Sequence, residues 1–166
     1  MIFLYTEQLE IGTIKANVTC FDLEQLGKEI TEEMQLLSKG EQRINFSHSG
    51  TNTLINLDPN LLKNSIINLI TNAIKYSADT CCIGFTSEIN DTHCIIIVKD
   101  EGIGIPEEDQ QHLFEPFFRA HNTENIPGTG LGLNIVARYI ALMKGTISYT
   151  SNLDKGTSFT LTFSTK

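Results

Sequence analysis

The stretch from Lys99 to Asp109, "KDEGIGIPEED", is the feature that most constrains the fold of this chain. An apolar run, "CIIIV", ends there in the carboxylate of Asp100, and two glycines one residue apart follow it. A plain surface turn needs only one Gly or Asn with a positive φ. We therefore expect the backbone at Gly102 and Gly104 to lie very close to another group at the end of a buried strand.

Length and charge narrow the class of protein. A chain of 166 residues is long enough for one domain with a hydrophobic core. The net charge of -8 argues against a nucleic-acid-binding surface, which needs basic stripes to contact phosphates. Nothing approaches the roughly 20 apolar residues of a membrane span, and "MIFLYTEQ" lacks the basic leader of a signal peptide. We expect a domain without direct membrane contact.

The four cysteines, Cys20, Cys81, Cys82 and Cys94, do not have the spacing of a metal site. None forms a C-x-x-C pair and no histidine cluster lies beside them, which argues against zinc. We interpret them as buried structural thiols in a reducing compartment. Cys81 and Cys82 are expected on opposite faces of one strand.

Hydrophobic periodicity predicts three helices and several strands. The helices are expected from the cap at Asp22 to Gly40, from Pro59 (capped by Asp58) to about Ser77, and from Gly130 to about Met143. Strands are expected at residues 42–48 and 52–58 around the turn "SGT", and as hairpins at 81–89 with 92–100 and 146–151 with 157–163. Residues 105–127 resemble a lid. This alternation predicts a sheet with helices on one face.

The second predicted helix has a polar side that is rich in asparagine. Asparagine is a poor helix former because its amide competes for the backbone, so Asn68 and Asn72 in one helix need a reason. An amide oxygen is a neutral ligand that suits Mg²⁺, and Lys75, one turn on, has the charge to bind phosphate. Tyr76 adds a flat ring with a polar tip. The alternative is a solvated face that happens to be rich in asparagine.

The two glycine-rich stretches suit a nucleotide. Because a carboxylate only accepts hydrogen bonds, Asp100 matches an amino group such as that of adenine and would repel the carbonyl of guanine. Gly102 and Gly104 would let the backbone turn under a planar base. In "PGTGLGLNIV", glycines at 128, 130 and 132 lead into a helix, whose first amides and dipole favour phosphate. Alone, these glycines also fit a simple turn, and they match neither the dinucleotide fingerprint nor the P-loop.

The segment between the two stretches contains "FEPFFR". Phe114, Phe117 and Phe118 would anchor a loop with few other apolar residues, which otherwise has the composition of a mobile lid. Arg119, the arginine of this loop, suits a terminal phosphate. The alternative places the three phenylalanines in the core and leaves Arg119 solvated.

The order of four blocks, "NLITNAIKYS", "DEGIGIP", "FEPFFR" and "GTGLGL", resembles the ATP-binding catalytic domain of bacterial sensor histidine kinases. This is the Bergerat ATP-binding fold, which type II topoisomerases, certain chaperones and mismatch-repair ATPases share. The resemblance implies an α+β protein: a two-layer α/β sandwich whose mixed, mostly antiparallel sheet carries three helices on one face. It also implies a catalytic domain at residues 21–166, preceded at 1–20 by a connector from a dimerisation module.

The resemblance also implies roles for the residues of the four blocks. Asn72 would be the Mg²⁺ ligand, Asn68 would belong to the same asparagine motif, and Arg119 would approach the γ-phosphate of ATP. Asn68, Lys75 and Arg119 would be catalytic. The residues implied to bind the nucleotide are Asn68, Asn72, Lys75, Tyr76, Asp100, Gly102, Gly104, Ile105, Phe114, Phe117, Arg119, Gly128, Thr129, Gly130, Leu131 and Gly132, and Phe118 would belong to the same phenylalanine motif as Phe114 and Phe117.

One position separates kinases from hydrolases within this resemblance. The hydrolytic relatives carry a Glu one turn before the magnesium-binding Asn, where it activates water as a general base. Here that residue is Asn68, whose amide lacks useful basicity. This favours a domain that holds ATP for attack by another nucleophile, a histidine imidazole, and contributes positioning and charge neutralisation.

The phosphoaccepting histidine itself is missing. His48, His93, His112 and His121 are not followed by the acid and Thr-Pro of the expected motif, and we interpret them as ordinary surface or half-buried residues. The chain is therefore expected to be a monomeric, cytoplasmic catalytic portion that binds Mg-ATP without phosphorylating itself. Its partners would be a histidine-bearing dimerisation domain and, indirectly, a response regulator. Alternatives of the same fold are an anti-sigma-factor-type serine kinase and a nucleotide-binding regulator without transfer activity.

Overall fold

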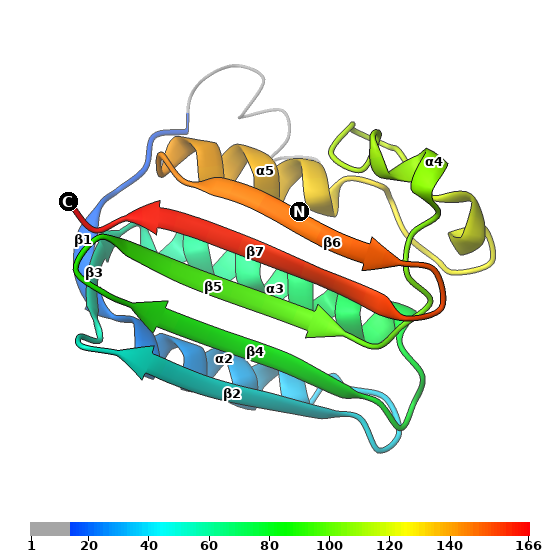
Figure 1. The fold of residues 1–166 in the computed structure, drawn as a ribbon, viewed down its shortest axis with the longest axis horizontal. Coiled ribbons are helices and arrows are strands. Elements are labelled where there is room, and N and C mark those ends of the chain that lie inside the picture. Colours follow the sequence, from blue (N-terminus) through cyan, green and yellow to red (C-terminus); the bar gives the residue numbers. More distant parts are fainter. Residues whose placement is uncertain (1–13) are drawn as a thin grey trace.

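The computed structural model describes residues 14–166, which form a sheet layer and a helix layer (Figure 1). The strands are β1 (Thr19–Asp22), β2 (Arg43–Gly50), β3 (Leu54–Leu57), β4 (Cys82–Ile89), β5 (His93–Asp100), β6 (Thr146–Asn152) and β7 (Gly156–Ser164). The helices are α2 (Leu23–Gln35), α3 (Pro59–Tyr76), α4 (Glu107–Gln110), the 3₁₀ turn η1 (His121–Thr123) and α5 (Gly132–Leu142).

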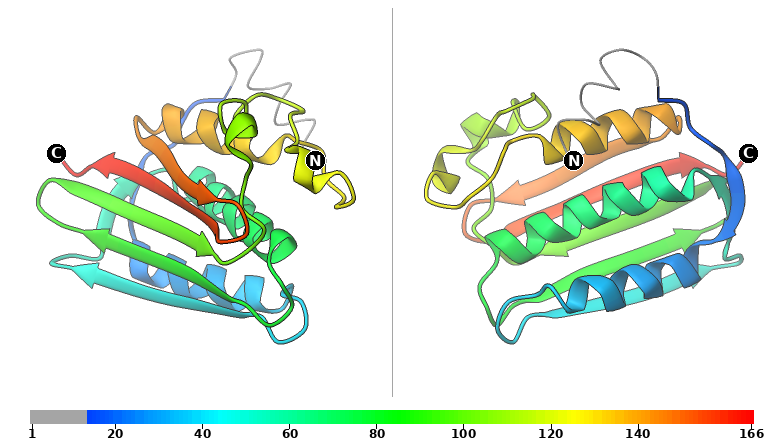
Figure 2. Two further views of the ribbon diagram at one scale, coloured as in Figure 1. Left: turned by 45° about the vertical axis from the view of Figure 1, so that its right-hand side comes forward. Right: turned by 180° about the vertical axis from the view of Figure 1, so that it is seen from behind.

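The main sheet has five strands in the order β2-β4-β5-β7-β6. β2 and β4 are parallel, whereas the other neighbours are antiparallel. The views from the side and from behind place α2, α3 and α5 on the same face of this sheet (Figure 2). The predicted α+β sandwich, with a mixed, mostly antiparallel sheet and three helices on one face, is confirmed.

Local side-chain contacts explain where the helices begin. Asp22 caps α2 by accepting the backbone N–H of Gln25 at 2.8 Å. Asp58 caps α3 by accepting the N–H groups of Asn60 and Leu61, with Pro59 in the first turn. α5 begins at Gly132 without a side-chain cap, two residues later than the sequence predicted. Its first turn therefore leaves backbone N–H groups available.

The hydrophobic core lies between the helices and the sheet. Ile66 and Ile70 of α3 are fully buried, as are Ile83 on β4 and Ile96 on β5, two inner strands of the sheet. Ser65 of α3 is also buried, and its hydroxyl donates to the carbonyl of Leu61 at 2.8 Å. Most of the surface of α3 is therefore packed in the core. One narrow polar strip of the helix is left outside the core.

Two of the predicted strands pair differently from the simplest expectation. The segments on either side of "SGT" do not pair with each other: β2 joins β4, and β3 joins β1. Ser49 and Gly50, which were predicted in the turn, lie within β2. The physical reason is that both strands bury alternate residues in the hydrophobic core, so long-range packing selects their partners.

The N-terminal connector was predicted at residues 1–20. Residues 1–13 lie outside the described part of the chain, and Thr19 and Cys20 pair with Leu57 and Asn56 as part of β1. The boundary at residue 20 stays a prediction. In residues 14–166, no helix is both long and apolar enough to cross a membrane.

The interpretation of the cysteines as buried thiols is correct only for Cys94. Cys20 and Cys82 are exposed and Cys81 is intermediate. Cys20 lies in a two-stranded sheet outside the main one, and Cys82 alternates along β4 with the buried Ile83 and Phe85, so its side chain lies on the face of the main sheet opposite the helices.

Candidate functional site

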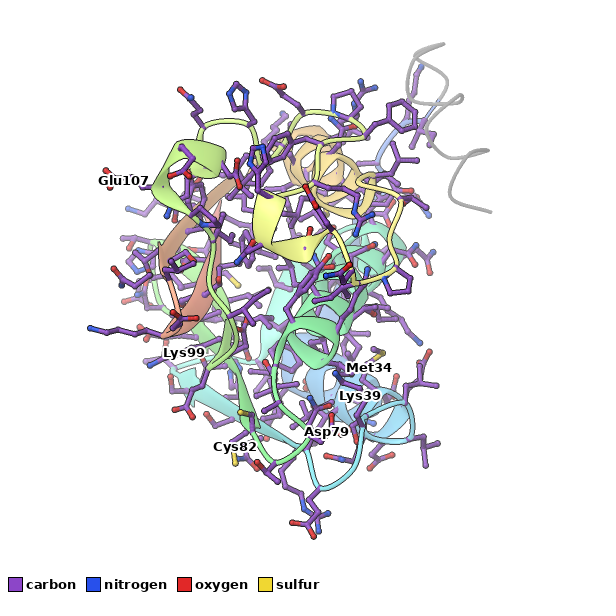
Figure 3. The ribbon with its side chains drawn as sticks, turned by 90° about the vertical axis from the view of Figure 1, so that its right-hand side faces the viewer. Met34, Lys39, Asp79, Cys82, Lys99 and Glu107 are labelled. Carbon is purple, nitrogen blue, oxygen red and sulfur yellow. The ribbon has the colours of Figure 1, made fainter. Side chains whose placement is uncertain are left out.

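A cavity of about 280 Å³ lies between α3, the end of β5, the lid (residues 105–127) and the start of α5. Figure 3 shows this end of the molecule, where Lys99 of β5 and Glu107 of α4 point outward. The lining residues are Asn68, Thr71, Asn72, Lys75, Tyr76, Asp100, Ile103, Gly104, Ile105, Leu113, Phe118, Arg119, Ala120, Thr123, Gly128, Thr129, Gly130, Gly132, Leu133, Thr157 and Phe159.

The asparagines of α3 form one wall of the cavity. Asn68 donates its amide to the carbonyl of Asn64 one turn earlier at 2.9 Å, which orients the side chain on the helix surface. Its Oδ1 lies opposite Gly132, where an added Cβ would be only 3.1 Å away. The polar strip of α3 therefore faces the first turn of α5, and amide oxygens are presented to the uncapped end of that helix.

Asp100 lies at the end of β5 and is buried, with 8% of its surface exposed. Its Oδ1 accepts the backbone N–H of Gly102 at 2.8 Å. Burial raises the pKa of this carboxyl, while hydrogen bonds from the backbone of Gly102 and Thr157 lower it in part. A carboxylate that lines a cavity and is only partly satisfied by backbone donors suits a ligand that donates a hydrogen bond.

Gly102 and Gly104 first make room for the chain's own backbone. A Cβ on Gly102 would lie 2.4 Å from the carbonyl oxygen of Tyr76. Gly104 has a φ of 65°, and a Cβ there would lie 2.1 Å from the carbonyl oxygen of Asn152. These contacts fix the loop after Asp100 between α3 and the β6–β7 turn. The floor of the cavity is therefore fixed by both elements.

Two cations lie together in the cavity. Burial, and secondarily the charge of Arg119, lower the pKa of the Lys75 ammonium. Lys75 Nζ lies 5.2 Å from the centre of the Tyr76 ring. Arg119 donates to the carbonyl of Thr123 at 2.6 Å and to that of Ile126. Two neighbouring cations without a facing acid among the described contacts suit an anionic ligand.

The glycines before α5 are needed for different reasons. Gly130 has a φ of 73°, and a Cβ there would lie 2.6 Å from the backbone of Phe117 and Phe118. Its carbonyl accepts the N–H of Phe117 at 3.0 Å, which joins the lid to the start of α5. A Cβ on Gly128 would lie 2.6 Å from the Nζ of Lys75, the end of a flexible side chain, and 3.9 Å from the Nε of Arg119. Gly130 is therefore a structural requirement, and Gly128 keeps space for the ammonium.

The three phenylalanines have different surroundings. Phe114 packs against the core, and its ring lies 5.9 Å from that of Tyr149. Phe118 lines the cavity. Phe117 is 61% exposed and has a φ of 65°, so it is not a core residue. The alternative that all three belong to the core is therefore wrong for Phe117.

Most of the residues predicted for the site meet at this cavity. Four do not line it: Gly102 and Phe114 support its walls, Phe117 is exposed, and the side chain of Leu131 is fully buried. Sequence reasoning missed Thr71, Ile103, Leu113, Ala120, Thr123, Leu133, Thr157 and Phe159, and it named Phe118 only as a member of the phenylalanine motif. Thr71 was detectable from its place between Asn68 and Lys75 on α3, whereas Thr157 reaches the site only because β7 pairs with β5.

Comparison with known proteins agrees with this arrangement. Residues 57–166 match the family described as histidine kinase-, DNA gyrase B- and HSP90-like ATPases. The sensor histidine kinase RcsC of Escherichia coli is 40% identical over 109 residues, which are 64% of this chain and 11% of that protein. The signal transduction histidine-protein kinase ArlS of Staphylococcus aureus is 36% identical over 114 residues, which are 68% of this chain and 25% of that protein. The chain thus spans between a tenth and a quarter of these relatives.

Solved structures give the same result. Full-length ShkA, crystallised with AMPPNP, has a TM-score of 0.85 and 26% identity over 99% of this chain and 35% of its own. The Acinetobacter baumannii histidine kinase AdeS has a TM-score of 0.76 and 28% identity over 99% of this chain and 75% of its own. The catalytic domain of the histidine kinase ThkA has a TM-score of 0.70 and 28% identity, and this chain covers 96% of it. The resemblance to the catalytic domain of histidine kinases is confirmed, and the chain belongs to the family of histidine kinase-, DNA gyrase B- and HSP90-like ATPases.

Proposed function

We propose that this chain binds Mg-ATP and transfers the γ-phosphate to a histidine on a separate helical-hairpin domain, as part of a two-component signalling system. The observation that supports this most is the single cavity in which the asparagines of α3, the carboxylate of Asp100 and the glycine-rich start of α5 meet. The relatives are sensor histidine kinases, which favours this proposal over a serine kinase of the same fold.

The end of the cavity near β5 would hold the adenine. Asp100 would accept a hydrogen bond from the exocyclic amine at an acceptor position that Gly102 does not occupy. Tyr76, whose pKa burial raises, would lie along the adenine and ribose as a neutral ring. Gly104 and Ile105 line the same part of the cavity and would contact the base.

The end of the cavity near α5 would hold the phosphates. Lys75 and Arg119 would neutralise their charge, and the backbone of Gly128, Thr129, Gly130 and Leu131 would supply N–H donors before the uncapped start of α5. Leu131 would act through its backbone, since its side chain is in the core. Arg119 would have to exchange a carbonyl partner for phosphate.

The donor set fits Mg²⁺. Asn72 lines the cavity from α3, and Asn68 directs its amide donor to Asn64, which leaves its oxygen as an acceptor. Neutral oxygen ligands from one or two side chains, completed by phosphate and water, are typical of magnesium in phosphoryl-transfer sites. When bound, the ion would neutralise charge on the phosphates.

The chemistry assigned to the chain is positioning rather than base catalysis. Phosphoryl transfer passes through a loose transition state with charge on the equatorial oxygens. Lys75 and Arg119 are placed to stabilise that charge. Asn68 cannot deprotonate water, because its amide is not basic and its NH₂ is used by Asn64. Slow hydrolysis would preserve ATP for the imidazole of the partner domain.

The acceptor would come from elsewhere in the parent protein. His48 and His93 lie on strands, whereas His112 and His121 lie on the lid and each contact a carboxylate. None lies in a helical hairpin. We infer a monomeric, cytoplasmic domain that works with a histidine-bearing dimerisation domain, a response regulator and the connector at residues 1–20.

The proposal is tested by mixing the chain with a purified histidine-bearing hairpin domain from a related kinase and γ-labelled ATP. We expect acid-labile phosphohistidine on the hairpin, dependent on magnesium. Asn72→Ala should abolish the transfer, whereas Asn64→Ala, a matched change outside the cavity, should retain it. No binding of ATP at millimolar concentration would contradict the nucleotide assignment, and binding without transfer to any cognate hairpin would contradict the kinase assignment.

A further inference from the structure

A buried carboxylate joins two distant parts of the lid. Asp109, on α4, is 2% exposed, yet both of its oxygens face a single residue, His121 of η1. Oδ2 accepts the backbone N–H of His121 at 2.8 Å, and Oδ1 lies 2.7 Å from its Nδ1. The imidazole itself is largely exposed, at 76%. Asp109 is thus a buried acid whose side-chain hydrogen bonds close a twelve-residue loop of the lid.

A second hydrogen bond joins the same two parts of the lid. Asn122 donates its side-chain amide to the carbonyl of Gly104 at 2.9 Å. Gly104 lies before α4, and Asn122 follows His121, so the two contacts fasten the same pair of segments. Both segments supply lining residues of the cavity: Gly104 and Ile105 from the first, and Ala120 and Thr123 from the second. The two contacts therefore define one wall of the cavity.

The same segment of the lid also positions Arg119. Thr123 donates both its backbone N–H and its hydroxyl to the carbonyl of Ala120, at 2.9 and 2.7 Å. The carbonyl of Thr123 in turn accepts the guanidinium of Arg119 at 2.6 Å. His121 lies between Ala120 and Thr123. Its bond to Asp109 therefore fixes the turn at residues 120–123, whose Thr123 carbonyl accepts the guanidinium of Arg119.

The charged groups around His121 are acidic. Asp109 faces it from α4, and the weaker fields of Glu124 and Glu108 come from the chain after η1 and from α4. The hydrogen bond with Asp109, followed by its charge, raises the pKa of the His121 imidazole. At neutral pH a larger share of the ring is therefore protonated than in an isolated histidine.

We propose that Asp109 and His121 form a lid latch, a pair of positioning residues that keeps residues 118–123 in the shape the nucleotide needs and that weakens when His121 loses its proton. The latch rests on the proposed nucleotide binding at this cavity. Neither side chain lines the cavity, so both would act through the backbone of residues 119–123.

The pH dependence has a definite sign. Because the latch raises the pKa of His121, its ionic contribution is fully present below the ordinary pKa of histidine and is lost as pH rises through the raised value. The loss is partial, since a neutral ring with a proton on Nδ1 still donates to Asp109. Nucleotide affinity should therefore fall moderately as pH rises from below the ordinary histidine pKa of about 6.5 through the raised value.

The test compares variants by calorimetric titration with Mg-AMPPNP. Asp109→Asn replaces one acceptor by an NH₂ that faces a donor of His121, and His121→Ala leaves Oδ1 unpaired. Each should weaken binding roughly tenfold. The matched control is Glu115→Gln, which removes the acid of the exposed His112–Glu115 pair on the same lid and should leave affinity within about twofold.

A conservative variant separates positioning from general damage. His121→Asn keeps a donor near the position of Nδ1 but does not titrate. It should bind like the wild type at about pH 8.5 and should lack the fall in affinity with rising pH that the wild type and Glu115→Gln share. Comparing variants cancels the titration of the nucleotide itself.

Hydrogen exchange supplies a measurement without nucleotide. Backbone amides of residues 119–126 should exchange faster in Asp109→Asn than in the wild type, while those of α3 stay unchanged. The latch is refuted if the wild type binds nucleotide and both Asp109→Asn and His121→Ala bind equally well. A wild type that binds no nucleotide, with the exchange difference intact, would instead contradict the proposed function.

Discussion

The carboxylate of Asp100 accepts the backbone N–H of Gly102 at 2.8 Å, where β5 ends and the lid begins. This bond folds the chain back on itself directly after the strand and fixes the carboxylate at the edge of the cavity. One oxygen is engaged by the protein's own backbone. The carboxylate of Asp100 is therefore oriented before any ligand binds.

Asp100→Asn should weaken ATP binding roughly 10- to 100-fold. If the amide oxygen keeps the bond to Gly102, the amide NH₂ points where the carboxylate oxygen was and meets the adenine amine donor to donor. Calorimetric titration with Mg-ATP measures the effect. Glu101→Gln, the neighbouring exposed acid, is the matched control and should change little.

The same substitution should not lower the stability of the nucleotide-free protein. Burial raises the pKa of Asp100, so the folded protein binds this proton at a higher pH than the unfolded chain does. The ionised carboxylate therefore opposes folding at neutral pH, and a neutral amide removes that term. Thermal unfolding at pH 7 should show an unchanged or higher Tm; a clear decrease would show that the bond to Gly102 outweighs the burial of charge.

Lys75 should take up a proton when nucleotide binds at alkaline pH. Burial and Arg119 lower its pKa in the free protein, whereas phosphates beside it would raise that pKa. Calorimetric titrations at about pH 9, in two buffers with different ionisation enthalpies, measure the uptake. We expect uptake in the wild type and in Lys28→Met, a lysine on α2, and none in Lys75→Met. Equal uptake in all three would assign the proton to another group.

Asp58→Ala should lower the free energy of unfolding by about 2 to 3 kcal/mol. Asp58 is buried and accepts three backbone N–H groups, those of Asn60, Leu61 and Asn17. The comparison is Asp22→Ala, which removes the more exposed cap of α2 and should lower stability by about 1 kcal/mol. Urea unfolding followed by circular dichroism measures both. Asp22 also accepts the hydroxyl of Thr53 at 2.8 Å, so equal effects would mean that the bond from Asn17 to Asp58 contributes no more than that one.

Cys94 should be unreactive in the folded protein. It is fully buried, and burial raises the pKa of its thiol to about 12, so almost no thiolate is present at neutral pH. Cys20 and Cys82 are exposed and should react quickly with an aromatic disulfide reagent at about pH 8, with Cys81 slower. Cys94 should react only after denaturation. Rapid modification of Cys94 in the native protein would indicate local opening of β5.

The sequence alone was sufficient for the features that depend on neighbouring residues. The caps at Asp22 and Asp58, and the helix from Pro59 to about residue 76, follow from side chains that bond within a few positions of themselves. The four glycine, asparagine and phenylalanine blocks were also recognisable, because their spacing is a local property. For that reason most residues predicted for the cavity are found there.

The tertiary structure decided what depends on contacts between distant parts of the chain. β2 pairs with β4 rather than with its neighbour β3, because burial in the hydrophobic core selects the partner. Thr157 reaches the cavity only through the pairing of β7 with β5. The bond between Asp109 and His121 spans twelve residues of lid that carry no periodic pattern, so nothing in the sequence indicated it. Side-chain type and spacing are local, but the partner of a buried charge is set by the fold that surrounds it.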